Sequence, residues 1–427
     1  MSLKKTKIAI AGIGTVGSGV IQLIKKNSIQ KNFGIEVTAI ASRRKLKKAN
    51  LGFSSTNFFN DAERLINFDN YDILVELIGG DEGIPKKIVF DALKKGKSVV
   101  TANKALVSKH WKKLNEITKK KKSEIKYEAA VAGGIPIIKV LNDFLISNKI
   151  KKIYGILNGT SNFILTNMLY SKSKFEKILE EAQQLGYAEA DPSFDIDGVD
   201  TSHKLAILSS LAFNINCDLK SIYVEGIRNI DLTDLLYADE LGYKIKLLGI
   251  AQVRQKQIIN FVYPCLVGQN ELISKVDGVF NAIVIESDFC KKSFFQGEGA
   301  GSQPTATSVL SDIIDLSIKE PKEKLKPKVK ILKNINILDR SGSFYLRFST
   351  IDQPGVISGI TNEFKKNNIS MKTMLQKDGV SKEKKCVTIV ITTHTCNEND
   401  MMKALKKINN LKFVLKKTAY IRIENFK

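Results

Sequence analysis

Residues 6–26 read TKIAIAGIGTVGSGVIQLIKK, and this stretch decides the fold of the N-terminal part of the chain. The apolar run at 6–11 predicts a strand, a glycine-rich turn follows it, and VIQLIKK continues as a helix. The glycines have G-x-G-x-x-G spacing: the first two let the backbone turn tightly and approach a pyrophosphate, and the third lets the helix pack on the strand. The pattern therefore predicts a dinucleotide-binding turn with cofactor contacts at Gly12, Gly14, Thr15, Val16 and Gly17.

Further strands and helices alternate as far as about residue 135. The apolar runs that predict strands lie at 35–41, 72–80, 97–106 and 125–136. This alternation is typical of an α/β protein with a Rossmann-type, doubly wound parallel sheet, so we expect such a domain over 1–135. A second glycine-rich turn leads into a helix near 304–318 that we expect to complete the domain. Strand ends and this turn add three candidate cofactor residues: Gly79, Lys104 and Gly301.

The second predicted strand ends at Ser42, Arg43 and Arg44. An NAD site normally places an acid there, to bind the ribose hydroxyls. Two guanidinium groups in its place suit a 2′-phosphate, so the sequence predicts NADP(H) as the preferred cofactor and NAD(H) as the alternative. The competing interpretation is that these arginines are two more surface cations in a basic chain.

An acidic run at 186–204 reads GYAEADPSFDIDGVDTSHK in an otherwise basic chain. It holds five acids and no base before Lys204, and carboxylates this dense repel each other unless a cation or a buried lysine lies among them. Asp200 and Lys204 are four residues apart and share a face if they lie on one helix. Lys204 is therefore a candidate for acid–base work. The alternative is an acidic loop that caps a helix over 202–213, with Thr201 or Ser202 as the N-cap.

Composition limits the classes of function. The chain has 427 residues, 67 Lys+Arg and 44 Asp+Glu, for a formal charge of +23. The lysines are spread along the chain without interleaved aromatic residues, so we expect no specific nucleic-acid binding. No run approaches the roughly 20 apolar residues of a membrane span. Five scattered cysteines without a CxxC pair fit a reduced cytoplasm.

The C-terminal part of the chain predicts a separate module. Residues 319–330 are charged and hold two prolines, which indicates a linker that we place at 319–341. The stretch 342–427 then shows a β-α-β-β-α-β order. Between the first domain and the linker, 136–318 predicts an α+β catalytic and dimerisation domain. Since no candidate acid–base residue lies beyond the linker, we expect the C-terminal module to be removable without loss of catalysis.

Motifs from these regions resemble one known family in their order along the chain. They are GIGTVG, DILVELIGG, TANKALVSKH, AAVAGGIP, GILNGTSNFIL, GYAEADPSFDIDGVDTSHK and GAGSQPTATS. This series resembles homoserine dehydrogenase, and the tail DQPGVISGITNEFKKNNIS resembles an ACT regulatory domain. The resemblance implies reduction of L-aspartate 4-semialdehyde to L-homoserine with NAD(P)H, on the route to threonine, methionine and isoleucine.

The resemblance also implies roles for residues. Lys204 would donate the proton, oriented by Asp200 and Asp195. The substrate-binding candidates are Glu189 for the ammonium group and, for the carboxylate, Lys104, Thr160 and Tyr187. A monovalent cation such as Na⁺ would bind Glu128 and the carbonyls of Val131, Gly133 and Ile135. The family further implies a homodimer or homotetramer, with threonine as the effector of the ACT domain.

Two other functions are compatible with parts of the pattern. One is a ligand sensor without catalysis, built from a dinucleotide-binding module and an ACT module. The other is a different amino-acid semialdehyde dehydrogenase, but the phosphorylating enzymes of that kind use a cysteine nucleophile. Here no cysteine precedes Cys217.

Overall fold

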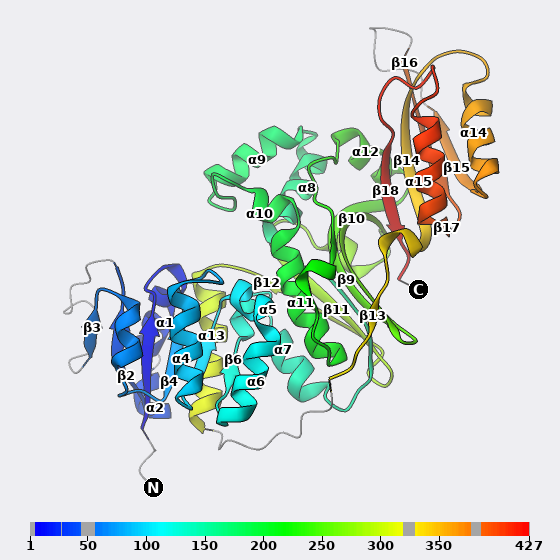
Figure 1. Cartoon of the computed structure of the whole chain (residues 1–427). Helices are drawn as coiled ribbons and strands as arrows, with labels where there is room; N and C mark the ends of the chain where they lie inside the picture. The colour runs from blue at the N-terminus through cyan, green and yellow to red at the C-terminus, as the bar shows by residue number, and fades with distance from the viewer. Residues whose placement is uncertain (1–4, 27, 44–55, 319–328, 377–385, 427) are drawn as a thin grey trace. The chain divides into compact units, whose positions relative to one another are not determined.

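The computed structural model describes residues 5–26, 28–43, 56–318, 329–376 and 386–426. Its residues form two units, each built from three separate stretches of chain (Figure 1). The first unit contains Met1–Leu157, Ser202–Ile222 and Phe280–Leu332. The second contains Asn158–Thr201, Tyr223–Val279 and Lys333–Lys427.

The N-terminal strand β1 (Thr6–Ala11) lies inside a parallel sheet of order β3-β2-β1-β4-β5-β6. The other strands are β2 (Ile35–Ala41), β3 (Asn57–Phe59), β4 (Ile73–Glu76), β5 (Ser98–Thr101) and β6 (Ile125–Lys126). Because every side chain of β1 from Ile8 to Ala11 is fully buried, both faces of the sheet must be covered.

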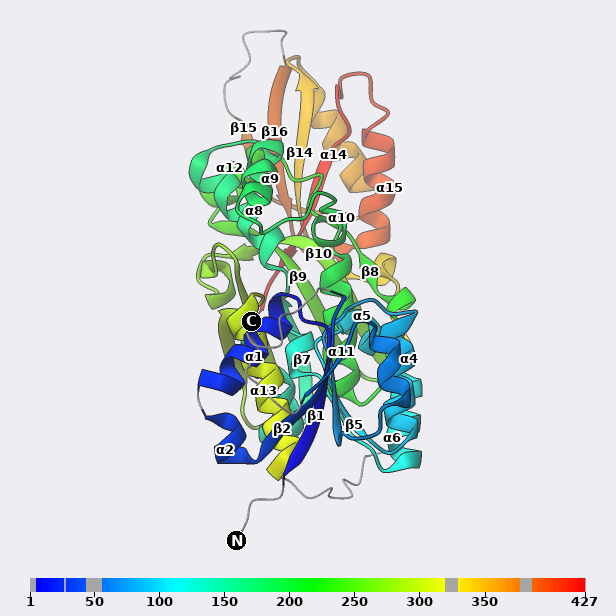
Figure 2. The same ribbon diagram turned by 90° about the vertical axis from the view of Figure 1, so that its left-hand side faces the viewer.

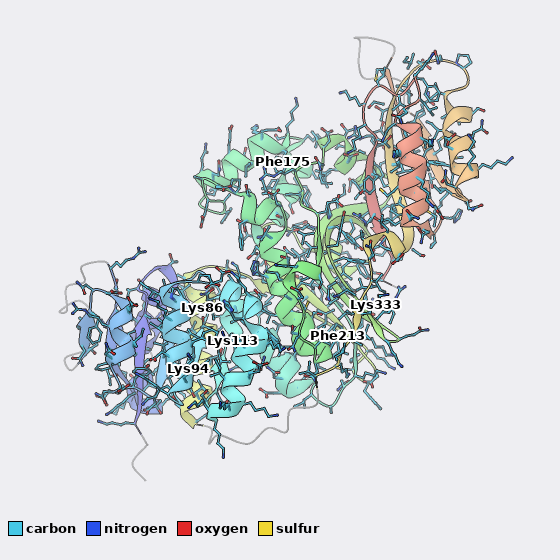
Figure 3. The ribbon with its side chains drawn as sticks, in the orientation of Figure 1. Lys86, Lys94, Lys113, Phe175, Phe213 and Lys333 are labelled. Carbon is cyan, nitrogen blue, oxygen red and sulfur yellow. The ribbon has the colours of Figure 1, made fainter. Side chains whose placement is uncertain are left out.

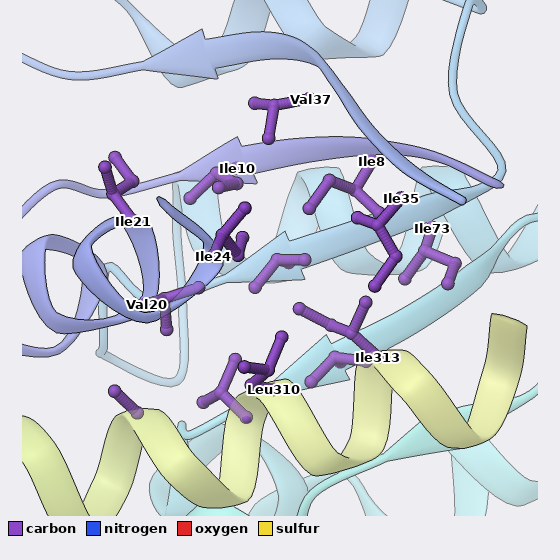
Figure 4. Close-up of a cluster of buried hydrophobic side chains, with 14 of the residues drawn as sticks. Ile8, Ile10, Val20, Ile21, Ile24, Ile35, Val37, Ile73, Leu310 and Ile313 are labelled. Carbon is purple, nitrogen blue, oxygen red and sulfur yellow. The ribbon is translucent and has the colours of Figure 1, made fainter. Parts of the chain in front are cut away.

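Helices cover both faces of this sheet. On one face Ile8 and Ile10 pack against α1 (Thr15–Lys26) and α13 (Ser302–Ile318), as Figure 4 shows. On the other face Ala9 and Ala11 pack in a cluster that includes side chains from the helices α4 (Ile84–Lys94) and α6 (Trp111–Lys121). The doubly wound sheet expected from the sequence is therefore confirmed, and α13 completes it although it begins 291 residues after β1 ends.

The fifth predicted strand is shorter than the apolar run suggested. Only Ile125 and Lys126 pair in the sheet, and a 3₁₀ turn at Glu128–Ala130 follows. The backbone N–H of Glu128 donates to the Asp312 carboxylate, and Gly133 has a φ of +41°. A side-chain acceptor and a left-handed turn thus replace the strand pairing.

The first unit also contains three antiparallel strands that pair in the order β12-β11-β7. Its strands are β7 (Ile150–Ile156), β11 (Phe280–Ser287) and β12 (Lys292–Glu298). Short helical segments precede it at α5 (Lys104–Lys109), α7 (Ile137–Lys139) and η3 (Val140–Phe144). The long helix α11 spans Val199–Phe213.

The second unit is built on a hairpin of β9 (Tyr243–Arg254) and β10 (Gln257–Gly268). Its helices are α8 (Gly159–Ser171), α9 (Phe175–Gln184), α10 (Ser193–Ile196) and α12 (Leu232–Glu240). The short strand β8 (Tyr223–Val224) pairs with β10. No helix in the described residues is both long enough and apolar enough to cross a membrane.

The C-terminal part of this unit has the expected β-α-β-β-α-β order. Its elements are β14 (Ser341–Ile351), α14 (Val356–Lys366), β15 (Met371–Gln376), β16 (Cys386–Thr393), α15 (Glu398–Ile408) and β18 (Ala419–Glu424), with β17 (Cys396–Asn397) beside β14. The strand order is β18-β14-β16-β15, and both helices pack against β14 and β16 through one apolar cluster (Figure 2).

The C-terminal module is joined to the rest of its unit by sheet pairing. Strand β18 runs parallel to β10, with Cys265 opposite Arg422. Within the segment predicted as a linker, β13 (Lys333–Asn334) also pairs with β10, and Arg340 is buried. The described part of this segment is therefore packed against the second unit and is not an extended linker.

Candidate active site

The glycine-rich turn after β1 has the geometry that a pyrophosphate needs. Gly12 has a φ of +100°, and a Cβ on Gly17 would lie 2.2 Å from the carbonyl oxygen of Gly12. Gly14 faces open space, with nothing within 4 Å of where its Cβ would lie. Thr15 begins α1, and its carbonyl accepts a hydrogen bond from Ser302 of α13. The turn thus presents a helix N-terminus and a free approach for phosphate.

A buried network fixes the ends of β4 and β5, where a cofactor would lie in this fold. The Glu76 carboxylate accepts the backbone N–H groups of Ile78 and Gly79 at 2.8 and 3.0 Å and the Thr101 hydroxyl at 2.6 Å. Thr101 in turn accepts the N–H of Asn103. The sequence reasoning missed Glu76, although one acid inside the apolar run DILVELIGG was a signal.

Asn103 extends this network to the helix that begins at Lys104. Its side chain caps α5 by accepting the Leu106 N–H at 3.1 Å, and it donates to the carbonyl of Gly80 at 2.6 Å. Lys104 is half-buried at the first position of α5. Among the other predicted cofactor residues, Gly79 and Gly301 have φ values of +86° and +117°.

The structure describes only one of the two predicted arginines. Arg43 is exposed, two residues after the end of β2, and the preceding Ser42 N–H donates to the carbonyl of Phe59. Arg44 lies outside the described residues. The position of Arg43 at a strand end agrees with the sequence expectation.

Asn158 holds two of the acids in the second unit. Its amide nitrogen donates to Asp195 at 2.7 Å and to Asp200 at 2.9 Å, while its oxygen accepts the Ser161 N–H at the start of α8. An amide nitrogen has two hydrogens, so both are used here. Asn158 therefore brings the two carboxylates together, and it was absent from the predicted site although it lies in the quoted GILNGTSNF motif.

The other acids of the run have different surroundings. Asp197 forms an ion pair with Arg228, and Asp191 accepts the Ser193 N–H. Glu189 is exposed. The described residues contain no group of three or more acid, histidine or cysteine side chains that could hold a metal ion. The acids of the run thus have separate partners or face solvent and do not form one metal cluster among the described residues.

Lys204 lies on α11, which begins three residues earlier than the predicted helix at 202–213. Thr201 and Ser202 are consequently inside the helix, and the alternative that either is its N-cap is wrong. Lys204 is 8 % exposed, and its Nζ donates to the Leu157 carbonyl at 2.6 Å. Asp200 lies one turn earlier on the same helix.

Two of the substrate candidates, Thr160 and Tyr187, lie together in the second unit. The Thr160 hydroxyl donates to the Tyr187 carbonyl at 2.6 Å, and the Tyr187 ring meets Phe163 edge-on at 5.1 Å. This places the start of α8 beside the segment that leads to Glu189. Tyr187 is 43 % exposed and can contact a ligand.

Glu128 lies in a buried setting that disfavours its charge. Burial and the nearby Asp312 raise the pKa of Glu128 to about 7, although the N–H groups of Ile138 and Lys139 donate to its carboxylate. Burial also raises the pKa of Asp312 to about 6. The carbonyl of Gly133 accepts the Ser308 hydroxyl at 2.6 Å. A cation beside these two buried acids would offset their charge.

A basic groove of about 510 Å³ lies elsewhere on the first unit, between α4 and α6. Figure 3 labels three of its lysines, Lys86 and Lys94 from α4 and Lys113 from α6. Part of this charge is paired locally, since Lys86 contacts Glu82 at 2.7 Å. The groove contains none of the predicted site residues.

Comparison with known proteins agrees with this geometry. Residues 12–128 match the family model "Homoserine dehydrogenase, NAD binding domain", and 136–314 match the model "Homoserine dehydrogenase". A homoserine dehydrogenase of Helicobacter pylori is 40 % identical, with 99 % of this chain and 100 % of that protein covered.

Solved structures give the same result. The crystal structure of a homoserine dehydrogenase from Thiobacillus denitrificans is 37 % identical, covers 99 % of both chains and superposes with a TM-score of 0.91. A hyperthermophilic archaeal homoserine dehydrogenase in complex with NADPH is 30 % identical and has a TM-score of 0.63, covering 75 % of this chain and 100 % of that one. On these similarities, the chain belongs to the homoserine dehydrogenase family.

Proposed function

We propose that this chain reduces L-aspartate 4-semialdehyde to L-homoserine, with Lys204 as the proton donor. The nicotinamide cofactor, when bound, supplies a hydride to the aldehyde carbon. The oxygen of that carbonyl becomes an alkoxide and takes a proton from the Lys204 ammonium group. The observation that carries this role is a buried ammonium held by the Leu157 carbonyl at 2.6 Å. A lysine held in one place can transfer its proton without a reorganisation cost.

The test is loss of NADPH absorbance with aspartate semialdehyde. Lys204→Ala should lower kcat by about 100-fold or more, the usual scale for loss of a general acid, with little change in NADPH binding. Lys152→Ala is a matched control, because Lys152 is another buried lysine of the first unit. Near-normal turnover in Lys204→Ala would exclude Lys204 as the donor.

Asp200 and Asp195 are the proposed orienting partners of Lys204. The supporting observation is that Asn158 holds both carboxylates and that Asp200 precedes Lys204 by one helical turn. We further propose that Glu189 binds the substrate ammonium, and that Lys104, Thr160 and Tyr187 bind its carboxylate. Glu189→Gln should then mainly raise the KM for the amino-acid substrate; a fall in kcat alone would contradict this assignment.

The cofactor is proposed to be NADP(H) in preference to NAD(H). The open approach at Gly14 and the tight turn at Gly12 support a bound pyrophosphate. The strand-end position of Arg43 supports contact with a 2′-phosphate, together with Arg44 from the sequence. Replacing both arginines by serine should weaken NADPH binding far more than NADH binding. Equal losses would mean that they supply only general positive potential.

A monovalent cation, with Na⁺ as the candidate, is proposed at Glu128 and the carbonyls of Val131, Gly133 and Ile135. The raised pKa of Glu128 supports this, because a buried acid whose charge is disfavoured gains from a cation beside it. The cation would neutralise this charge and hold the turn after β6. It takes no part in the chemical step.

Regulation and assembly are proposed from the family resemblance. The C-terminal module would act as an ACT domain that binds threonine, and the enzyme would work as a homodimer or homotetramer in the cytoplasm. All five cysteines are free thiols, which supports a reducing compartment. Assaying the full-length enzyme with and without threonine tests the effector. Unchanged kcat and KM at saturating threonine would exclude it.

A further inference from the structure

We infer that His203 is a positioning residue: through Ser108 it ties helix α11, which carries Lys204, to helix α5, which begins at Lys104. This inference rests on the proposed roles of the two lysines. The bond joins Ser108 Oγ and His203 Nδ1 at 2.7 Å, between residues 95 positions apart. Both residues are buried, at 5 % and 8 % exposure, so the bond is shielded from competing water.

The bond lies very near both lysines along their helices. Ser108 follows Lys104 by four residues, one helical turn along the same face of α5. His203 immediately precedes Lys204, and successive helical side chains point about 100° apart. His203 therefore reaches α5 while Lys204 reaches the Leu157 carbonyl. This one hydrogen bond therefore fixes Ser108, which lies one turn after Lys104, and His203, which is next to Lys204.

Helix α5 needs such a bond because it is short. Its six residues form fewer than two turns, and helices of this length depend on tertiary contacts. Its first turn is fixed by the Asn103 cap and the Gly80 carbonyl. Its last turn meets α11 through Ser108, whose hydroxyl also lies 3.2 Å from the Ala105 carbonyl within α5. Loss of the bond would let α5 pivot about its capped end and displace Lys104.

The experiment is a double-mutant cycle in the full chain. Ser108→Ala and His203→Ala should each lower kcat or raise the KM for aspartate semialdehyde, by about three- to tenfold, the scale of one buried hydrogen bond. The double variant should lose no more than either single one, because both remove the same bond. Ser108→Thr and His203→Asn keep a polar atom near the original position, and each should restore most of the loss.

Ser210→Ala is the matched control, since this buried serine of α11 accepts only a local bond from Cys217 N–H. It should leave kcat and KM near those of the parent, with all variants checked for parental thermal unfolding. Additive losses in the cycle, no loss in Ser108→Ala, or an equal loss in Ser210→Ala would overturn the inference. The proposed proton donor would still stand in each case, because only Lys204→Ala tests it.

Discussion

Two groups of buried charges in this molecule differ in whether the charges within each group are opposite or alike. In the second unit, Arg422 pairs with Glu398 and with Glu225, and its guanidinium lies 4.7 Å from the centre of the Tyr263 ring. In the first unit, the buried Glu128 and Asp312 are both acids. Opposite charges that are buried together stabilise each other's charged forms, and the acidic partners raise the pKa of Arg422. Each of two like charges raises the free-energy cost of burying the other, so they need a proton or a bound cation to offset the charge.

The difference separates a structural cluster from the proposed cation site. The Arg422 cluster joins β18 to β8 through the Tyr223 hydroxyl and to α15 through Glu398, so its charges are paired within the protein. Glu128 and Asp312 are both acids, so a cation beside them would lower the cost of their burial. Buried charge alone therefore does not indicate a functional site; its sign and its pairing do.

The largest expected effect comes from breaking the cluster of opposite charges. Glu398→Ala should lower the free energy of unfolding of the second unit by about 3–5 kcal/mol, because Arg422 is left buried without its main partner. Denaturant unfolding measures this. Asp400→Ala is the control on the same helix, since its ion pair with Lys403 is exposed, and it should cost less than about 1 kcal/mol. Similar losses in both variants would mean that burial adds nothing to the pairing.

The next effect concerns the pH dependence of stability. The pKa of Glu128 is raised from 4.5 to about 7. Its contribution to the stability of the folded state is therefore fully present below pH 4.5 and is lost as the pH rises through 7. In sodium-free buffer, the Tm of Glu128→Gln relative to the parent should therefore rise between pH 5 and pH 8. The shift corresponds to a change on the order of 2–3 kcal/mol. A constant difference across this range would contradict the raised pKa.

A third prediction concerns sodium. Replacing choline chloride by sodium chloride at pH 8 and equal ionic strength should raise the Tm of the parent, because binding to the folded state stabilises it. The gain should shrink at pH 5.5, where a proton on Glu128 competes with the cation. Glu128→Gln should show little gain at either pH. An equal gain in this variant would place any sodium effect elsewhere in the molecule.

The smallest expected effect comes from removing one of the like charges. Asp312→Asn keeps an oxygen that can accept the Glu128 N–H but removes a negative charge. The pKa of Glu128 should then fall toward its ordinary value, so the loss of stability with rising pH should be smaller and should be complete at a lower pH. The Tm profile from pH 4.5 to 8 measures this. A profile unchanged from the parent would mean that burial alone raises the Glu128 pKa.

Much of the fold could be predicted from local sequence patterns. The glycine spacing from Gly12 to Gly17 and the apolar run of β1 predicted the doubly wound sheet, and the β-α-β-β-α-β order of the tail was also correct. The run at 125–136 misled, because Glu128 takes its backbone partner from Asp312, 184 residues away. Side-chain acceptors at that separation leave no periodic signal.

Candidate site residues could be named from the sequence where their chemistry is local, and residues whose partners lie far along the chain were missed. The acids at 189–200 and Lys204 stand out against a basic chain. Asn158 did not, because its role depends on two carboxylates 37 and 42 residues away. The bond from Ser108 to His203 spans 95 positions and is invisible to spacing arguments.

The pairing of β18 with β10 has a consequence for synthesis on the ribosome. The first unit ends at Leu332, whereas the sheet of the second unit needs Arg422 opposite Cys265. At about 5–20 residues per second, the ribosome needs on the order of 5–20 seconds to add the chain between these points. During that interval the part of β10 from Cys265 to Val267 lacks its β18 partner, in a nascent chain whose first unit has already been synthesised. Translation pauses in this window would prolong its exposure to chaperones and to neighbouring nascent chains.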